Sequence, residues 1–315
     1  MKPNHIGVIS SGGLSSPAVE SPTNIVEHLL WYGPARERWR EVGAAFLLIL
    51  LVAALYFKIG VKLVTDWYEL PDFSHGFLIP FFVVFLVWNR RDGIRSVRLT
   101  QSWAGLLLVV LALFVLATGV LGADLFLSRL SFVLLIAGLV WTLCGRDMLW
   151  HTKFMFCVLL LAIPLPALIF NQLTFPLQLL ASRMASELLP LAGVPVLRDG
   201  NVIQLPAMQL EVAEACSGIR SLMSLFTIAI IYGYFLEKTT WRRTVLALAS
   251  IPIAVAANVF RIFGTGLCVQ YWNPDKAVGF FHEFSGWLMF LMSLACLYLV
   301  HRTMCRVSHE GLRRV

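Results

Sequence analysis

"WAGLLLVVLALFVLATGVL", residues 103–121, contains no charged residue and decides the fold class. A helix needs about 20 mostly apolar residues to cross the hydrocarbon core of a bilayer. Seven further runs have this length and composition: 42–60, 73–89, 125–143, 152–170, 216–236, 244–270 and 283–301. The sequence therefore predicts an all-α integral membrane protein with about eight transmembrane helices.

The composition of the whole chain excludes a soluble fold. Of its 315 residues, 58% are hydrophobic and 14% charged, and the mean hydropathy is +0.78. Soluble domains carry about 25% charged residues. We interpret the net charge of +7 as basic residues in cytoplasmic loops, which contact anionic membrane lipids, and we expect no nucleic-acid partner.

The predicted eight-helix membrane domain covers residues 41–302. It follows a disordered cytoplasmic tail, residues 1–40, that is rich in Ser, Gly, Pro and Asn, and it precedes a basic cytoplasmic tail, residues 303–315. The first apolar run is long enough to span a bilayer and stands after three arginines. We therefore predict an uncleaved first helix rather than a signal peptide.

The distribution of basic residues predicts the orientation. With the N-terminus in the cytoplasm, most of the 25 lysines and arginines fall in cytoplasmic segments. Arg129 and Arg183 are among the few on the opposite side, and both termini are expected in the cytoplasm. A span at 171–193 would reverse the later helices, but its Arg183 and Glu187 favour an amphipathic helix, either interfacial or re-entrant.

A small extracytoplasmic β-hairpin is predicted between this amphipathic segment and the sixth helix. In "VPVLRDGNVIQL", residues 194–205, the pair Asp199-Gly200 stands between β-prone residues. Such a pair is a signal for a short hairpin turn. The hairpin is expected to lie against the membrane and to fix where the sixth helix begins.

Three residues from different predicted helices carry the candidate chemistry. Cys216 begins the sixth helix, Arg261 lies inside the seventh, and His282 opens the eighth, so the predicted topology places all three in the outer half of the bilayer. A helix N-terminus and a nearby cation favour the reactive thiolate. An arginine within a span is costly and is a functional hypothesis by default, with a structural salt bridge as the alternative. A thiol, a base and a cation suffice for acyl transfer through a thioester.

Four further residues are predicted to support this group. Asn258, one turn before the buried arginine, could orient its guanidinium, and Glu214 could orient the histidine. Arg220 lies nearer the membrane surface. His75, in "LPDFSHGFLIP" at the outer end of the second helix, could line the substrate entrance. The six cysteines show no zinc-ligand spacing, so neither a metal nor a cofactor is predicted.

At these residues the sequence resembles the exosortase/archaeosortase family. The resemblance rests on "EACSGIRSL" at 214–222, "ANVFRI" at 257–262 and "HEFSG" at 282–286, with "SHG" at 74–76 and "IPLP" at 163–166. It extends from about residue 40 to 302. It implies a multi-pass thiol protease or transpeptidase of the bacterial inner membrane with an extracytoplasmic active site.

The resemblance also implies residue roles and partners. Cys216 would be the nucleophile, Arg261 the cation that stabilises the transition state, and His282 the proton donor or acceptor. The substrates would be exported proteins that end in a Pro-Glu-Pro motif, a hydrophobic helix and a basic tail. An association with exopolysaccharide synthesis is typical of the family, and any such function would require a separate partner protein.

Two alternatives from other functional classes remain at this stage. The first is a transporter or export channel, in which Arg261 binds an anion and His75 or His282 relays protons. The second is a scaffold for exopolysaccharide synthesis, in which the polar residues are merely structural. Only the protease requires the thiol of Cys216.

Overall fold

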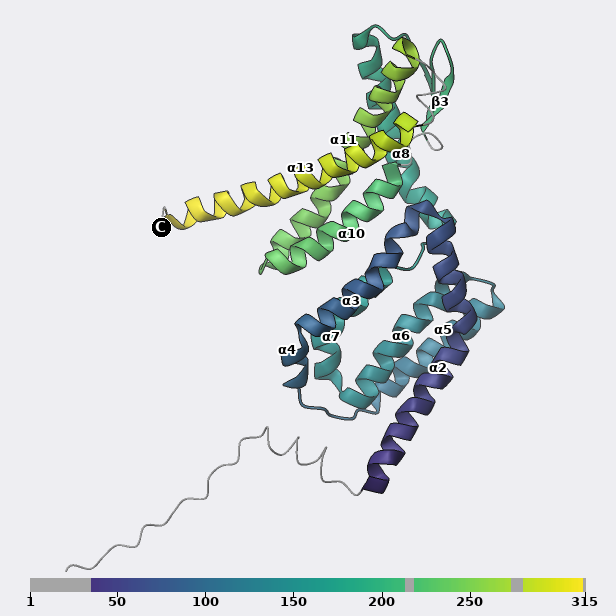
Figure 1. Ribbon diagram of the computed structural model, residues 1–315, viewed down its shortest axis with the longest axis vertical. Coiled ribbons are helices and arrows are strands. Elements are labelled where there is room, and N and C mark those ends of the chain that lie inside the picture. The colour runs from purple at the N-terminus through teal and green to yellow at the C-terminus, as the bar shows by residue number, and fades with distance from the viewer. Residues whose placement is uncertain (1–34, 213–217, 273–279, 314–315) are drawn as a thin grey trace, which may run out of the picture. The chain divides into compact units, whose positions relative to one another are not determined.

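The computed structural model describes residues 35–212, 218–272 and 280–313 (Figure 1). The chain divides into two units after Phe57, within helix α2 (Ala35–Glu69). The first unit therefore contributes only residues 35–57 of that helix. The end of the predicted disordered tail, residues 35–40, is helical, and residues 1–34 lie outside the described residues.

The second unit, from Lys58 onward, contains every other described element. After the end of α2 come η1 (Pro71–Phe77), α3 (Leu78–Asn89), α4 (Arg91–Arg95), α5 (Ala104–Leu121), α6 (Leu125–Cys144), α7 (Arg146–Leu160), α8 (Ala167–Leu188) and η2 (Leu189–Ala192). Three short strands follow: β1 (Leu197–Asp199), β2 (Val202–Gln204) and β3 (Gln209–Glu211). The last three helices are α10 (Gly218–Leu236), α11 (Thr240–Tyr271) and α13 (Phe280–Arg313).

Six of the described helical segments are long and apolar enough to cross a membrane: Val42–Glu69, Pro71–Asn89, Ala104–Leu121, Leu125–Cys144, Thr240–Tyr271 and Phe284–Arg306. A shorter apolar helix, Arg220–Leu236, corresponds to the predicted span 216–236. The prediction of an all-α integral membrane protein is thus confirmed. The count of eight spans is not, because only these six meet the criteria of length and hydropathy within the described residues.

The predicted span 152–170 is wrong as a single helix. Helix α7 ends at Leu160 and α8 begins at Ala167, directly after the "IPLP" sequence. Proline has no amide hydrogen to donate and its ring clashes with the preceding turn. Helix α7 ends four residues before Pro164, which has no amide hydrogen to donate to the carbonyl oxygen of Leu160, and the next helix, α8, starts directly after its N-cap Pro166.

The amphipathic segment forms helix α8, which packs along α11. The predicted hairpin is present and is extended by a third strand, giving an antiparallel sheet in the order β1-β2-β3. Asp199 pairs with Val202, so the two central turn residues are Gly200 and Asn201, one position later than predicted. Gly200 has a φ of +61° and Asn201 does not have a positive φ, as in the type II′ turn.

The sheet is joined to α8 and α11 by a common hydrophobic core. Ile203, Leu210 and Val212 from the sheet region pack with Ala185 of α8 and Ile262 of α11. All five side chains are almost fully buried. The sheet therefore holds the part of α11 that contains Arg261, the residue before Ile262.

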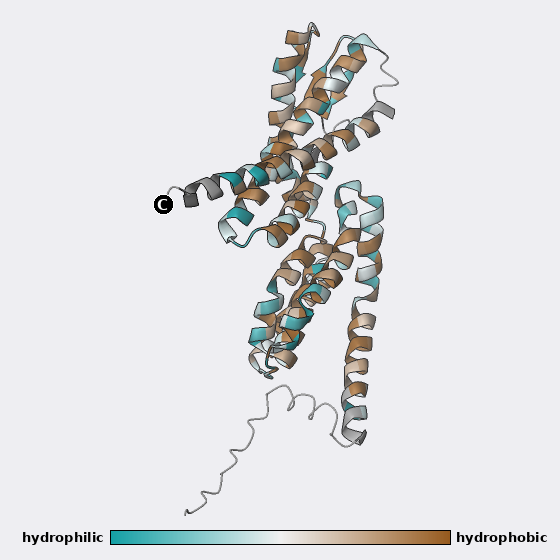
Figure 2. Cartoon of the chain, turned by 60° about the vertical axis from the view of Figure 1, so that its left-hand side comes forward, coloured by the Kyte–Doolittle hydropathy of each residue, from teal (hydrophilic) through white to brown (hydrophobic). Residues whose placement is uncertain are grey.

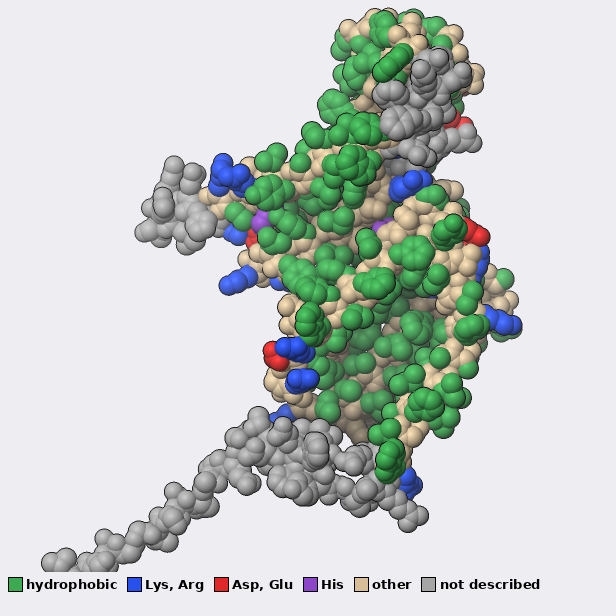
Figure 3. Space-filling model, in the orientation of Figure 1, with side chains coloured by type: hydrophobic (Ala, Val, Ile, Leu, Met, Phe, Trp, Pro, Cys, Tyr) green, Lys and Arg blue, Asp and Glu red, His purple; other side chains and the backbone are tan. Residues whose placement is uncertain are grey.

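Hydrophobic side chains are also exposed along the helices, as expected where the solvent is lipid. The helices in Figure 2 are largely hydrophobic along their lengths, and hydrophobic side chains cover most of the visible helix surface in Figure 3. Leu107 of α5 and Phe81 of α3 are examples of large exposed apolar residues. Such surfaces would be unstable in water and fit a bilayer.

A buried ion pair joins α2 to α6 within the second unit. Arg129 Nη2 donates to Asp66 Oδ2, and both side chains are nearly inaccessible. Lys62 Nζ lies 2.9 Å from the other carboxylate oxygen of Asp66. Arg129, expected simply as a basic residue on the outer side, is therefore neutralised inside the helical packing, which offsets the cost of placing its charge in a span.

Candidate active site

Arg261 is a buried side chain in the second half of α11. It is 8% exposed, and α11 packs against α8, α10 and α13. The helix continues through Arg261, whose carbonyl oxygen accepts a hydrogen bond of 2.9 Å from Thr265 Oγ1. The guanidinium is thus held by a helix that is covered on several sides, and a charge in such a place has strong electrostatic effects.

The guanidinium of Arg261 lies against Gly286 of α13. A methyl group placed on Gly286 would be 3.1 Å from Nη2 and 3.3 Å from Cζ of Arg261. Glycine is therefore the residue that lets the cation approach the backbone of α13 so closely. Gly286 ends the "HEFSG" sequence, one helical turn after His282. The structure thus brings two of the three sequence motifs into contact.

His282 lies in the first turn of α13, but its side chain is outside the described part of the structure. Cys216 and Glu214 lie outside the described residues as well. Helix α10 begins at Gly218, two residues after Cys216. The position of the thiol at the start of the sixth helix therefore stays a prediction.

The packing of the three last helices shows which of their ends lie together. Helices α10, α11 and α13 lie side by side (Figure 1), and Leu225, Leu246 and Leu297 share one core. Since Arg261 of α11 contacts Gly286 near the start of α13, these two helices run antiparallel. A three-residue connection from Leu236 to Thr240 makes α10 and α11 antiparallel too. The start of α10, the later part of α11 and the start of α13 therefore share one end of the bundle.

Asn258 is also buried on α11, one turn before Arg261. It lines a pocket of about 20 Å³ together with Thr174 and Gln178 of α8 and Leu222 of α10. Its Oδ1 accepts no hydrogen bond from the described residues. The pocket is lined mostly by apolar groups, has polar residues from both α8 and α11, and is large enough for a single water molecule.

Arg220 and His75 lie near the start of α10. Arg220 is exposed in the first turn of this helix and is close enough to Asp72 of η1 for their charges to interact. The η1 segment packs on α10, so it brings His75 to the same helix. His75 Nε2 lies 3.3 Å from the carbonyl oxygen of Leu161.

The "SHG" and "IPLP" sequences are held together by Trp67. Its Nε1 donates a 2.7 Å hydrogen bond to the carbonyl oxygen of Ala162, directly before "IPLP". Its indole also covers Gly76, where a methyl group would lie only 2.3 Å from Nε1. The "SHG" sequence and the two residues directly before "IPLP", Leu161 and Ala162, therefore form one local structure.

A cavity of about 620 Å³ adjoins His75. It is lined by Ser74 and His75, by Ile79 and Phe82 of α3, and by residues of α10 and α13 that include Thr227 and Phe290. Most of the lining is aliphatic or aromatic, and the hydroxyl groups and the imidazole are its polar part. It can accept an apolar chain with a polar group at the His75 position.

Two groups of polar residues in the structure were not predicted from the sequence. One is the Asp66–Arg129 pair, and the other is a cluster of Glu237, His301 and Cys305. The four-residue spacing of His301 and Cys305, which places both on one face of a helix, was the available signal for the second. Glu237 lies 64 residues before His301, so no local pattern indicated it.

The fold defines a multi-pass, all-α membrane protein with a buried arginine between α11 and α13. A family model described as "Transmembrane exosortase (Exosortase_EpsH)" matches residues 67–299, about three quarters of the chain. The chain therefore belongs to the transmembrane exosortase family, as the sequence motifs predicted. Comparisons with curated proteins and with solved structures gave no match.

Proposed function

We propose that this exosortase is a cysteine peptidase or transpeptidase embedded in the bacterial inner membrane. It cleaves the C-terminal, Pro-Glu-Pro-type sorting signal of exported, membrane-anchored proteins at the extracytoplasmic face. The contact between Arg261 and Gly286 is the observation that carries the proposal. Two facts support it: Gly286 is four residues after His282 in the sequence of α13, and α10, which begins two residues after Cys216, starts at the same end of the helix bundle.

In the proposed reaction the thiol proton of Cys216 passes to His282, and the sulfur attacks the scissile carbonyl carbon. The carbonyl oxygen becomes an oxyanion, and the Arg261 guanidinium stabilises it. When the C–N bond breaks, His282 donates the proton to the leaving amine and an acyl thioester remains on Cys216. Water or a second amine then attacks the thioester, which gives hydrolysis or transpeptidation and restores the thiol.

The local environment supports these roles. Cys216 stands two residues before α10, where the helix N-terminus favours the thiolate. Arg261 is buried and directly precedes Ile262 of the hydrophobic core, and a low-dielectric surrounding strengthens the attraction between a guanidinium and an oxyanion. Asn258, Arg220 and Glu214 act in the proposal as groups that orient these three.

The substrate reaches the site by lateral diffusion in the membrane, because its own C-terminal helix anchors it there. The cavity beside His75 supports a route for an apolar segment along α3 and α10. The basic tail of the substrate keeps it in the same orientation as the enzyme, whose two termini are cytoplasmic in this proposal. A separate partner protein linked to exopolysaccharide belongs to this proposal as well.

The decisive experiment is mass spectrometry of the C-terminus of a candidate substrate from cells that contain either the wild-type enzyme or Cys216→Ala. With the wild type, the expected product ends near the Pro-Glu-Pro motif, as a free acid or as an amide with an acceptor. With Cys216→Ala, unprocessed substrate accumulates. Cys296→Ala, at an exposed cysteine on α13, is the matched control and leaves processing unchanged.

This design also separates the enzyme from the two alternatives. A transporter or a scaffold does not require the thiol, so Cys216→Ala would retain its phenotype in both cases. Normal processing in that variant, with the protein inserted at the wild-type level, overturns the proposal.

A further inference from the structure

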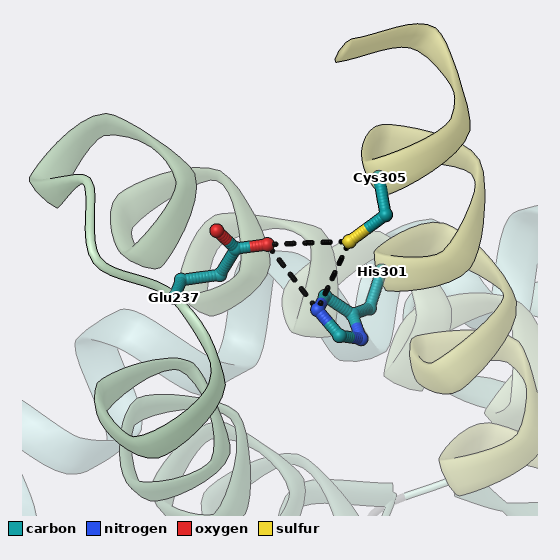
Figure 4. A group of neighbouring side chains, drawn as sticks. All are labelled: Glu237, His301 and Cys305. Carbon is teal, nitrogen blue, oxygen red and sulfur yellow. Dashed lines mark hydrogen bonds and ion pairs between the residues drawn. The ribbon is translucent and has the colours of Figure 1, made fainter. Parts of the chain in front are cut away.

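Glu237, His301 and Cys305 direct three different ligand atoms toward one point (Figure 4). His301 Nε2 lies 3.2 Å from Glu237 Oε1 and 3.4 Å from Cys305 Sγ, and the thiol sulfur lies 3.6 Å from the same carboxylate oxygen. Glu237 and His301 are buried, and Cys305 is partly exposed. The nitrogen, oxygen and sulfur atoms all carry lone pairs that point toward the same space. They can lie this close together only if they bind a common metal ion or share protons in hydrogen bonds.

The cluster lies at the other end of the helix bundle from Arg261. Glu237 directly follows α10, and His301 and Cys305 are four residues apart on the later part of α13. The 19 residues of α10 correspond to about 28 Å at 1.5 Å per residue. The cluster is therefore separate from the proposed catalytic residues and has no part in their chemistry.

The hydrogen-bond pattern is not that of a catalytic triad. In a triad, the nucleophile and the carboxylate occupy opposite nitrogens of the imidazole ring. Here both the thiol and the carboxylate face Nε2, while Nδ1 is 2.8 Å from the hydroxyl of Tyr232. A histidine that binds a metal usually has this arrangement. One ring nitrogen faces the metal site, and the other donates a hydrogen bond to a group outside it.

We propose that Glu237, His301 and Cys305 bind a zinc ion with tetrahedral geometry. Zinc bonds to sulfur, nitrogen and oxygen have well-defined lengths, and a tetrahedral site fixes the angles between them. Together these values place sulfur and nitrogen about 3.6 Å apart, nitrogen and oxygen about 3.4 Å apart, and sulfur and oxygen about 3.6 Å apart. The three separations in the cluster are 3.4, 3.2 and 3.6 Å, so each agrees within about 0.2 Å. Water supplies the fourth ligand.

The ligand types favour zinc over magnesium or calcium. Thiolate and imidazole are ligands of zinc and its neighbours, whereas magnesium and calcium require oxygen ligands. Known helical zinc sites also have two ligands one turn apart on a helix and a third ligand from another element. Here His301 and Cys305 are the helical pair and Glu237 is the third ligand.

The surrounding charges fit a bound dication. The glutamate and the thiolate together balance the charge of the zinc ion. Arg242 Nη1 binds the other carboxylate oxygen, Oε2, at 3.3 Å, and so leaves Oε1 for the metal. Arg243 Nε donates to the Glu237 backbone oxygen at 2.7 Å, and its guanidinium lies over the ring of Tyr234. These hydrogen bonds of the two arginines thus go to atoms other than the three ligand atoms, and the charge of Arg242 also acts on the nearby Cys305.

The proton balance of binding is simple. Cys305 releases its thiol proton and binds as the thiolate. His301 remains neutral, with its proton on Nδ1, and donates that proton to the Tyr232 hydroxyl oxygen. Binding therefore releases one proton for each zinc ion, and no redox step is involved.

The test uses the full-length protein without a histidine tag, in detergent micelles, titrated with cobalt(II) and then with zinc(II). Cobalt should bind once per chain, with the visible bands of a tetrahedral site and a thiolate-to-cobalt charge-transfer band, and zinc should displace it. Cys305→Ser should lose the charge-transfer band, whereas Cys296→Ser, nine residues earlier on α13, should keep it. Tyr232→Phe should keep the band but weaken zinc binding about 10- to 100-fold.

A charge-transfer band that persists in Cys305→Ser, or cobalt binding without such a band, overturns the proposal. X-ray absorption of the wild-type zinc-loaded protein gives a second readout that requires no variant. One sulfur and two or three nitrogen or oxygen neighbours per zinc ion are expected. A spectrum with no sulfur neighbour contradicts the site independently of how any variant folds.

Discussion

The guanidinium of Arg261 and the backbone of Gly286 touch across the interface of α11 and α13. Arg261 can approach α13 this closely because Gly286 has no side chain. It fixes how far the cation stands from the helix turn that carries His282. In the proposed reaction this distance decides whether the oxyanion and the proton donor can act on the same carbonyl group.

Gly286→Ala tests this contact. The added methyl group would lie 3.1 Å from Nη2, so the guanidinium must move by a few tenths of an ångström. Since a displacement of about 1 Å can cost about 100-fold in rate, we expect processing to fall about 10-fold. Alanine favours a helix over glycine by about 1 kcal/mol, so the thermal stability of the protein should not fall.

Gly264→Ala is the control for that variant. Gly264 lies on α11, three residues after Arg261, and a methyl group there meets no atom within 4 Å. Processing should stay at the wild-type level. Equal loss of processing in both variants would contradict the importance of the Arg261–Gly286 contact.

Arg261→Lys asks whether the planar guanidinium is needed or only its charge. Lysine keeps the charge but offers a point charge on a flexible stem in place of the fork of donors. Loss of one oxyanion donor slows acyl transfer about 100- to 1,000-fold, so we expect a decrease of that size in the ratio of processed to unprocessed substrate. Arg220→Lys, at an exposed arginine of α10, should change the ratio only a few-fold. A larger defect from Arg220→Lys would reverse the ranking of the two arginines.

Gly76→Ala tests the structure that joins "SHG" to the segment before "IPLP". Its methyl group would lie 2.3–2.6 Å from three atoms of the Trp67 indole, which also holds Ala162 through a hydrogen bond. Overpacking a buried site costs about 1–3 kcal/mol, so a lower melting temperature in detergent is expected. Gly60→Ala on α2, where a methyl group meets no atom within 4 Å, should be neutral or stabilising. Equal stability of the two variants would contradict the close packing at Trp67.

The apolar runs predicted individual helices well where no proline intervened. The run 103–121 corresponds to α5 (Ala104–Leu121), and 125–143 corresponds to α6 (Leu125–Cys144). Hydropathy alone did not detect the break at "IPLP". A single proline gave no break elsewhere, since Pro176 lies inside α8 and Pro252 inside α11. Neighbouring helices can accommodate one such residue, whereas two prolines in three positions end the helix.

The candidate site could be predicted only in part, because a local sequence pattern does not contain the contacts between helices. The charge of Arg261 within an apolar run identified it without any tertiary information. Its contact with Gly286 depends on the crossing of α11 and α13, and no local pattern contains that crossing. The same holds for Glu237, which meets His301 only because α10 and α13 pack together.

The buried pair of Asp66 and Arg129 gives the last prediction, which concerns stability alone. Removal of one partner leaves an uncompensated buried charge, which typically costs about 3–5 kcal/mol. We expect Asp66→Leu to lower the free energy of unfolding by that amount, measured by chemical denaturation in micelles, because it leaves the buried Arg129 without its carboxylate. The double variant Asp66→Leu/Arg129→Met should recover most of the loss, because apolar residues of similar size can replace a buried pair.

The exposed pair Arg183–Glu187 of α8, with N and O 3.1 Å apart, is the comparison, and Arg183→Met should cost less than about 1 kcal/mol. If Asp66→Leu is no more destabilising than Arg183→Met, the buried pair does not join α2 to α6 in the way that the structure indicates.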